Sequence, residues 1–320
     1  MYELTARDAE QVIKRARAAL QDYFRAHGLK YAVFGKSEGL DSAVIAGLLA
    51  GIEGIVPIGV LMPVESDPIA ERLGRLVLDH FAIRTLRVDL TREYHAICAK
   101  FYESGAIHDQ LLALAEDPAD ESWRQALRMQ KGRALGNSRV RLRMITLYHI
   151  AQVTKGIVVS TDNLSEYWMG FWTLNGDVGD ISPIQFVFKG MEEYSIAKAL
   201  GVPQAALEIV PTDGLEITLE NTDASQLDLP YAELDTVIAA LLQNGYDGST
   251  GSGPHRERAL GAASGATRIA LETVTGIADR MRATDFKRRW PVTFSRESLG
   301  LPSINALDIA AGPADPILAP

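Results

Sequence analysis

Two polar loops carry the side chains whose chemistry is easiest to foresee. The first, Ser37-Glu-Gly-Leu-Asp-Ser42, separates an apolar run from a segment with helical character. Backbone N–H groups at a helix N-terminus favour an anion, and two serine hydroxyls add donors. Asp41 could hold a Mg²⁺ ion that bridges phosphates. The loop lacks the GxxxxGK[ST] spacing of a Walker loop. A polar turn in which Asp41 or Ser42 caps the helix is an equally good interpretation.

The second polar segment runs from Ser160 to Ile184 and follows the short apolar run Ile157–Val159. It is long and glycine-bearing, and it contains Trp168 and Trp172. Ligands of open parallel sheets bind beyond the carboxyl ends of the strands, and long structured loops are usually functional. The alternative is a surface loop in which Asp and Gly shape turns and the tryptophans anchor the chain.

Alternating elements must position these loops. An amphipathic helix is expected over 5–27, and the later segments alternate between short apolar runs and helical periodicity. The expected strands are 31–34, 55–62, 85–90 and 157–159, and the expected helices are 43–49, 68–81, from 93, and 140–153. This alternation predicts an α/β fold, an open parallel sheet with helices on both faces.

The remaining segments are assigned more coarsely. Polar residues 104–137 are interpreted as a helical insertion, 211–235 as an acidic, turn-rich stretch and 244–254 as a flexible loop. A helix is expected over 255–282, followed by an extended tail from about residue 300 to residue 320. We expect a single domain that spans residues 1–320.

The totals exclude several classes of protein. The 320 residues carry a net charge of −9, which argues against a nucleic-acid-binding surface. The lone Cys98 excludes a disulfide framework and a cysteine-based zinc site within one chain. The N-terminus has no apolar signal segment, and no run approaches the ~18 apolar residues of a membrane span. We expect a cytoplasmic protein that does not bind membranes.

Seven segments, taken in order, resemble the motifs of ammonia-dependent NAD synthetases, which belong to the N-type ATP pyrophosphatases. The loop 37–42 is similar to SGGxDS, and 160–184 is similar to the GTDxxxE, GxxTKxGD and DIxP segment. The other matches are Gly136–Met144 with NxKARxRM, Phe188-Lys189, Pro211–Leu215, Tyr231–Asp235 with YxxID, and Phe286–Pro291 with HKRxxP. The resemblance implies the fold of the adenine nucleotide α-hydrolases.

The resemblance also implies a reaction. ATP activates the carboxylate of deamido-NAD as an adenylate with release of pyrophosphate, and ammonia then displaces AMP to give NAD. ATP would be the co-substrate and Mg²⁺ the metal. No glutaminase domain is recognised, so ammonia would arrive free or from a separate donor. A homodimer is expected by analogy.

Residue roles follow from the same resemblance, position by position. Those expected to be catalytic are Lys189, Asp41 and Thr212. Those expected to bind ATP are Ser37, Gly39, Asp41, Ser42, Thr161, Lys189 and Thr212. Those expected to face the dinucleotide substrate are Arg141, Asp177, Asp180 and Lys287, and the expected Mg²⁺ ligands are Asp41 and Glu166.

The chain departs from the family pattern at four places. Glu38 replaces a loop glycine, Leu174 a lysine and Phe286 a histidine, and Val178-Gly179 replaces a glycine pair. A carboxylate beside a pyrophosphate site is repulsive. Most of these changes face the dinucleotide. Two alternatives therefore stay open: an adenylating ligase that amidates a different carboxylate, and a non-catalytic homologue that binds nucleotide.

Overall fold

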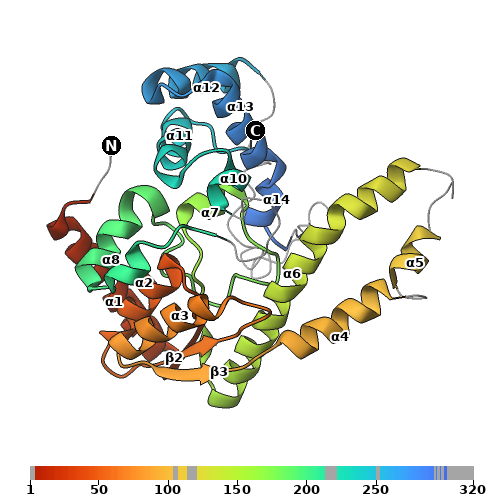
Figure 1. Cartoon of the computed structure of the whole chain (residues 1–320). Helices are drawn as coiled ribbons and strands as arrows, with labels where there is room; N and C mark the ends of the chain where they lie inside the picture. Colours follow the sequence, from red (N-terminus) through yellow and green to blue (C-terminus); the bar gives the residue numbers. More distant parts are fainter. Residues whose placement is uncertain are drawn as a thin grey trace. The chain divides into compact units, whose positions relative to one another are not determined.

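The computed structural model describes residues 4–103, 107–113, 121–212, 222–249 and 253–291, together with residues 293, 296, 299 and 300. The chain divides into two compact units (Figure 1). The first comprises Met1–Glu166 and Trp172–Asp235, and the second Tyr167–Phe171 and Thr236–Pro320. The single domain expected from the sequence stays a prediction. The expected tail lies outside the described residues.

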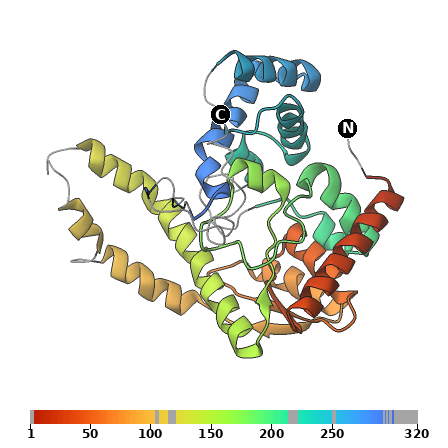
Figure 2. The ribbon, with the colours of Figure 1, turned by 180° about the vertical axis from the view of Figure 1, so that it is seen from behind.

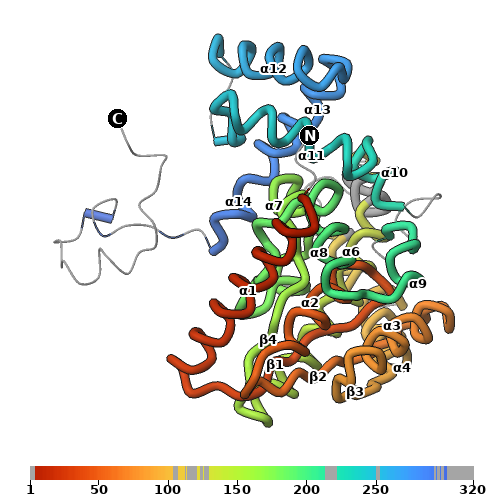
Figure 3. The backbone as a smooth tube through the Cα atoms, turned by 90° about the vertical axis from the view of Figure 1, so that its left-hand side faces the viewer, coloured from red at the N-terminus to blue at the C-terminus, as the bar shows by residue number. Residues whose placement is uncertain are grey.

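The first unit is built on a parallel sheet. Its strands in the described part of the chain are β1 (Tyr31–Gly35), β2 (Val56–Leu61), β3 (Arg84–Arg87) and β4 (Ile157–Val158). They lie in the order β3-β2-β1-β4, as Figure 3 shows along the edge of the sheet. Every neighbouring pair is parallel. The α/β fold with an open parallel sheet is thus confirmed.

Alternating side chains of the strands divide the core into two layers. Ala32 and Phe34 of β1 pack into the core layer that contains α1 (Ala6–Ala26), α2 (Leu40–Ala50), α3 (Pro68–His80) and α8 (Tyr194–Leu200). Val33 points into the other layer, with α4 (Thr91–Tyr102) and α6 (Glu121–Thr154). Helices therefore cover both faces of the sheet, and Figures 1 and 2 show the arrangement from the front and from behind.

Local signals explain where these helices begin. Thr5 and Asp8 form a capping box at the start of α1, in which each side chain bonds the backbone of the other residue. Asp67 accepts the N–H of Ile69 and Pro68 occupies the first position of α3. The insertion expected over 104–137 contains α5 (Ile107–Leu112) and the first half of α6, so the helix expected at 140–153 is the end of a much longer one.

Several short helices follow β4 in the first unit. Besides α8, they are α7 (Leu164–Met169), which ends in the second unit, the π-helix η1 (Lys189–Glu193), α9 (Gln204–Leu207), α10 (Asp223–Leu227) and the first turn of α11 (Tyr231–Gln243). In its described residues, the stretch expected to be acidic and turn-rich holds one short helix and the beginning of another. Among the described helices, none has the length and apolar character of a membrane span.

The second unit is helical. It contains the rest of α11, α12 (Pro254–Thr267), α13 (Leu271–Ala283) and α14 (Asp285–Arg288). The single helix expected over 255–282 is wrong, because Arg268 adopts a left-handed conformation at the end of α12. The hydroxyl of Ser264 donates to the carbonyl of Ile269, which offers the backbone an alternative to helical bonding. Neither Gly nor Pro marks this break in the sequence.

Candidate functional site

The two polar loops meet at the switch point of the sheet. The chain proceeds from β1 to β2 to β3 on one side, and β4 returns to the other side of β1. In such sheets the loops that follow the two central strands diverge and leave room for a ligand. Here the loop after β1 and the loop after β4 are joined by a hydrogen bond from Asn163 Nδ2 to Asp41 Oδ1, at 2.7 Å.

The centre of the site is the ammonium of Lys189, the first residue of η1. Its Nζ lies 2.8 Å from Asp41 Oδ2, 3.5 Å from Glu166 Oε1 and 3.9 Å from Asp223 Oδ2. It also lies 4.7 Å from the centroid of the Tyr231 ring. Lys189 is only 8% exposed, so these charges interact in a medium that screens them weakly.

The carboxylates that surround Lys189, here called the lysine cluster, are Asp41, Glu166, Glu193 and Asp223. Electrostatics divides them into two kinds. Burial opposes ionisation of Asp41, but the ammonium of Lys189 and the hydrogen bonds it receives hold the pKa of Asp41 below its usual value. At Glu166, burial outweighs the opposing charge of Lys189 and, with the neighbouring carboxylates, raises the pKa well above the usual value. At Glu193, burial and then the charge of Asp41 raise the pKa well above the usual value. Both carboxyl oxygens of Glu193 lack a hydrogen-bond partner among the described residues. Asp41 is therefore the carboxylate best suited to remain ionised.

Lys189 itself is held in its charged form. Burial lowers its pKa, but the facing groups Asp41, Tyr231 and Glu166 outweigh that effect and raise the pKa well above the usual value. π-Helices are rare and often mark functional positions. In η1 the N–H groups of Glu192 and Glu193 both donate to the carbonyl of Phe188, at 3.0 Å. The widened turn places Lys189 and Glu193 toward the same cluster.

The start of α11 fixes this arrangement. Asp235 Oδ2 accepts the N–H groups of Gly190 (2.7 Å) and Met191 (3.2 Å), and its Oδ1 accepts the hydroxyl of Ser165 at 2.5 Å. A Cβ on Gly190 would lie 2.4 Å from the backbone nitrogen of Ala232, so only glycine fits here. The YxxID-like segment thus supports the lysine from behind, a role that its sequence did not specify.

The loop after β1 is shaped by its own hydroxyls. Ser37 Oγ accepts the N–H of Gly39 at 3.1 Å and lies 3.1 Å from Ser42 Oγ. Gly39 is the N-cap of α2 and gives no side-chain capping bond, so the first amides of the helix are not covered by a cap. Neither Asp41 nor Ser42 caps α2 in the way the simpler interpretation required.

The carboxylate of Glu38 is balanced by cations. It raises the pKa of both Lys36 and Arg143, although burial, the larger effect, leaves each pKa lowered. Glu38 is also not among the described non-glycine residues with positive φ. The loop therefore takes this conformation without a glycine at position 38.

Three of the residues expected to face the dinucleotide belong to the first unit. Arg141 is exposed and its Nε donates to the carbonyl of Leu174 at 3.1 Å. Asp177 Oδ2 accepts the N–H of Thr173 at 2.6 Å, within the same turn. Asp180 uses both oxygens, for the hydroxyl of Tyr148 (3.0 Å) and the N–H of Val158 (2.8 Å). Their roles toward a substrate remain predictions.

Lys287 belongs to the second unit. Its Nζ donates to the carbonyl of Gly170 at 2.7 Å, while Arg280 and Arg288 donate to the carbonyls of Met169 and Trp168, both at 3.1 Å. These three cations satisfy carbonyls at the C-terminal end of α7, where positive charge is favoured. The structure thus gives Lys287 a structural partner, and its predicted substrate role is untested.

Thr161 and Thr212 have less defined surroundings. Thr161 is half-buried in the loop after β4, and Thr212 is exposed. The chain at Thr212 is connected to the lysine cluster through its neighbour, because the carbonyl of Pro211 accepts the N–H of Asp223 at 3.1 Å. Asp223 in turn accepts the hydroxyl of Tyr231 at 2.9 Å.

Several members of the site were not assigned from the sequence. Asp223 and Glu193 place negative charge beside Lys189, and Asn163 donates to Asp41. Asp162 is buried, with one oxygen lacking a hydrogen-bond partner among the described residues. Burial and then the charge of Asp177 raise the pKa of Asp162 to about 8. The polar run Asp162-Asn163, a few residues after the buried strand β4, was the available signal.

The donor set fits a Mg²⁺ ion shared with phosphates. Asp41 and Glu166 both direct carboxylate oxygens at the same point, where Lys189 Nζ now lies. Mg²⁺ commonly takes one or two carboxylates and completes its shell with water and substrate phosphates. Among the described residues, no group of three or more His, Cys, Asp or Glu side chains could hold a metal by itself.

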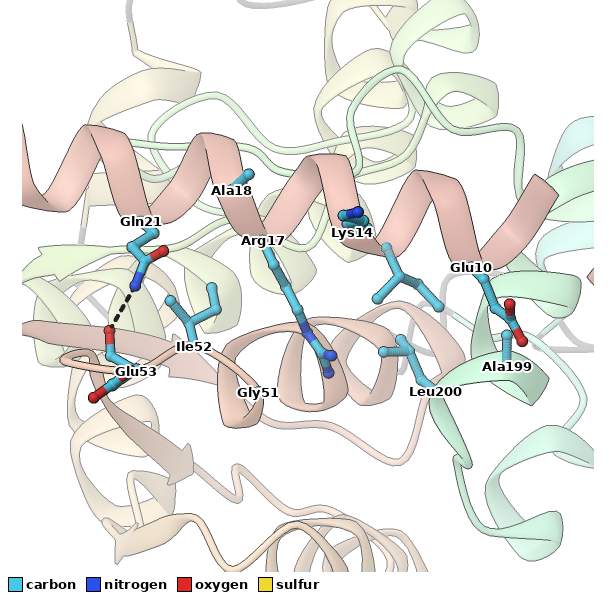
Figure 4. Close-up of a pocket in the computed structure, with 11 residues that line it drawn as sticks. Glu10, Lys14, Arg17, Ala18, Gln21, Gly51, Ile52, Glu53, Ala199 and Leu200 are labelled. Carbon is cyan, nitrogen blue, oxygen red and sulfur yellow. Dashed lines mark hydrogen bonds between the residues drawn. The ribbon is translucent and has the colours of Figure 1, made fainter. Parts of the chain in front are cut away.

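A cleft at the other end of α2 does not take part in this site. Figure 4 shows Arg17 of α1 reaching across it, where its Nε and Nη2 donate to the carbonyls of Leu48 (3.1 Å) and Gly47 (2.8 Å). Gln21 donates to the carbonyl of Glu53 at 3.2 Å. These bonds satisfy carbonyls at and beyond the end of α2. The lining residues come from α1, the α2–β2 turn and α8.

A parallel sheet with polar side chains gathered at its switch point defines an α/β protein that binds its ligand beyond the strand ends. The comparisons are more specific. The chain belongs to the NAD synthase family, whose sequence model matches residues 12–291. The resemblance inferred from the seven segments is thereby confirmed.

Individual relatives agree with this family. The NH3-dependent NAD(+) synthetase of Finegoldia magna is 33% identical over 211 residues, covering 66% of this chain and 76% of the relative. That of Methanocaldococcus jannaschii is 28% identical over 287 residues, covering 89% and 96%. A structure of NMN synthetase from Francisella tularensis matches with a TM-score of 0.65 at 22% identity, covering 90% of this chain and 98% of that one. The last similarity supports the fold alone.

Proposed function

We propose that this protein makes NAD from deamido-NAD and ammonia, and that it uses ATP to activate the carboxylate. The observation that carries the proposal is the position of Lys189 and Asp41, 2.8 Å apart at the switch point and directly beside the uncapped start of α2. Family membership supplies the reaction, and this geometry supplies a cation, an ionised carboxylate and free amides where phosphates would bind.

Activation comes first in the proposed reaction. The nicotinate carboxylate of deamido-NAD attacks the α-phosphorus of ATP, the bond to the bridging oxygen breaks, and pyrophosphate leaves. Charge accumulates on the phosphates in the transition state, so oriented amides and a buried ammonium lower the barrier. The loop of Ser37, Gly39 and Ser42 would hold the leaving pyrophosphate, and Lys189 would turn from Asp41 to the phosphates, with Thr161 and Thr212 as further ATP contacts.

A bound Mg²⁺ would neutralise phosphate charge, with Asp41 and Glu166 as its ligands on this chain. The affinity of Asp41 for protons is already low in the presence of Lys189. Binding of a second cation at Asp41 would free Lys189 from its partner.

Amidation completes the reaction. Ammonia attacks the carbonyl carbon of the acyl-adenylate, AMP leaves, and the amide of NAD forms after loss of a proton. We propose Arg141, Asp177, Asp180 and Lys287 as contacts of the dinucleotide. Their present partners are mostly backbone atoms. Substrate would have to compete with these contacts, so the assignments are best tested by single substitutions that measure KM for deamido-NAD.

The test is pyrophosphate release by the purified protein with ATP, Mg²⁺, ammonium and deamido-NAD, with NAD measured in parallel. Formation of NAD that requires all four components supports the proposal. Pyrophosphate release only with another carboxylate would indicate a ligase of different specificity, for which Leu174 and Phe286 are the motivating departures. Omission of each component in turn is the control.

A protein that binds nucleotide without turnover is the third possible outcome, and Glu38 is the departure that motivates it. Because Lys36 and Arg143 already offset the Glu38 carboxylate, we expect the native chain to be active. If the native chain binds ATP without releasing pyrophosphate and Glu38 is the cause, Glu38→Gly should restore turnover. An inactive Glu38→Gly protein that still binds ATP would exclude that explanation.

A further inference from the structure

Lys36, the residue before the loop, folds back into the loop that it precedes. It is 4% exposed, and its Nζ donates to the carbonyl of Ser37, to the carbonyl of Gly39 at 3.2 Å and to Ser42 Oγ at 2.8 Å. An ammonium has three N–H donors and no acceptor, so three acceptors satisfy it completely. The loop is thus wrapped around an internal cation.

This contact determines the direction of the loop amides. In a trans peptide, the C=O of one residue and the N–H of the next point in opposite directions. Because the carbonyls of Ser37 and Gly39 point toward Lys36, the N–H groups of Glu38 and Leu40 point to the other side of the loop. Successive amides that point to one side of a loop form an anion-binding concavity.

The charge of Lys36 matters because the loop also contains Glu38. A carboxylate in a phosphate-binding loop weakens anion binding, and its partners here are Lys36 from the end of β1 and Arg143 from α6. Arg143 is fixed at the end of β2, where its Nε donates to the carbonyl of Met62 at 3.1 Å. Of these two cations, only Lys36 donates hydrogen bonds to the loop itself.

We propose that Lys36 is a positioning residue for the pyrophosphate of ATP: it presets the direction of the loop amides, and its protonated form offsets the negative charge of Glu38. The inference rests on the proposed role of the loop in binding ATP. The three donors of the Lys36 ammonium are taken by acceptors of the loop, so Lys36 would act without contacting the phosphates. It acts through the backbone of the loop and through its charge.

The proton on Lys36 provides a readout that a purely structural role would lack. Burial lowers the pKa of Lys36 to about 7, against the opposing effects of Glu38 and Asp41. α3 contributes Gly74, which has no side chain, at the Cγ of Lys36. An added anion favours the charged form of a lysine and raises its pKa. The native protein should therefore take up protons when pyrophosphate binds above pH 7.

The experiment is calorimetric titration of inorganic pyrophosphate, and of ATP, into the native protein and Lys36→Met. Each titration is run near pH 8 in two buffers with different enthalpies of ionisation. We expect Lys36→Met to bind both ligands ~10- to 100-fold more weakly, as for loss of a charged hydrogen-bonding group. Proton uptake should disappear in Lys36→Met. Lys100→Met, the same change at an exposed position of α4, should match the native protein.

Binding by Lys36→Met within twofold of native would overturn the proposal. So would weaker binding by the variant if the native protein takes up no proton between about pH 7 and pH 9. Should Lys36→Met not fold, Glu38→Gln is the second variant: it should tighten pyrophosphate binding and lower the pH at which uptake occurs, and no change in either would refute the inference. A native protein that binds pyrophosphate but makes no NAD would refute the proposed function alone.

Discussion

Replacement of Lys189 by methionine should destabilise the first unit strongly, and more so at neutral than at acidic pH. Methionine keeps an unbranched apolar stem against the Tyr231 ring and removes the charge. The ammonium now lies 2.8 Å from Asp41 and 3.5 Å from Glu166, and its side chain is 9% exposed. Removal of one partner from a buried ion pair costs about 3–5 kcal/mol, because the other charge is left uncompensated.

A matched control is available in α8. Lys198 lies with its Nζ 4.4 Å from the centroid of the Tyr194 ring, a geometry like that of Lys189 over Tyr231, but Lys198 is exposed. Lys198→Met should cost at most about 1 kcal/mol. The difference between the two variants isolates the effect of the buried carboxylates.

The pH dependence has a definite sign. The pKa of Asp41 is held below its usual value in the folded protein, so its ionisation contributes stability above the unfolded pKa, which is lost as pH falls through the folded pKa. The deficit of Lys189→Met should therefore be full at pH 7 and shrink below about pH 4. Unfolding in urea, followed by circular dichroism at both pH values, measures this difference.

The double variant Lys189→Met/Asp41→Asn sharpens the assay. It removes both members of the pair and should recover part of the stability lost in Lys189→Met alone. The reasoning is refuted if Lys189→Met and Lys198→Met unfold within about 1 kcal/mol of each other at pH 7, or if the deficit is the same at acidic pH.

Three further predictions concern supporting residues. The pKa of Asp162 is raised to about 8, so this carboxyl favours the fold only while protonated, and the native protein should lose stability as pH rises from about 5 to 8. Asp162→Asn should reduce that loss by up to ~1.4 kcal/mol per pH unit, and parallel urea titrations of variant and native protein check this. Gly190→Ala should cost ~1–3 kcal/mol or more of stability and thereby lower the thermal midpoint, whereas Gly132→Ala, with open space around it, should not lower it. Tyr231→Phe should cost ~1–3 kcal/mol by removing the donor to the buried Asp223, and unchanged urea unfolding would contradict that role.

Local patterns were sufficient for much of the fold. The run Tyr31–Gly35 could be predicted because a buried parallel strand is continuously apolar. The polar loop and the helix behind it could be predicted because a short loop of small polar residues and glycine commonly precedes an anion-binding helix N-terminus. The same reasoning failed at Arg268, where no Gly or Pro marks the break between α12 and α13. There Arg268 takes the left-handed conformation, and the Ser264 hydroxyl donates to the carbonyl of Ile269 just beyond the helix.

The candidate site shows the same division. Asp41, Glu166 and Lys189 could be nominated because each lies in a motif-like segment close to a strand end or turn. That they converge on one point depends on contacts across 122 to 148 residues of sequence, which no local pattern encodes: the separation is 148 residues for Lys189 and Asp41, and 122 for Asn163 and Asp41.

The sequence by itself therefore determined the class of fold, the two polar loops and the family. The tertiary structure decided which charges share a buried environment. It assigned Glu193 and Asp223 to the lysine cluster and Asn163 to Asp41, and it turned Lys36 into the loop that it precedes. The physical reason is that a residue type specifies what a side chain can donate, accept or ionise. Only the packed arrangement of distant segments specifies its partners and the solvent screening between them.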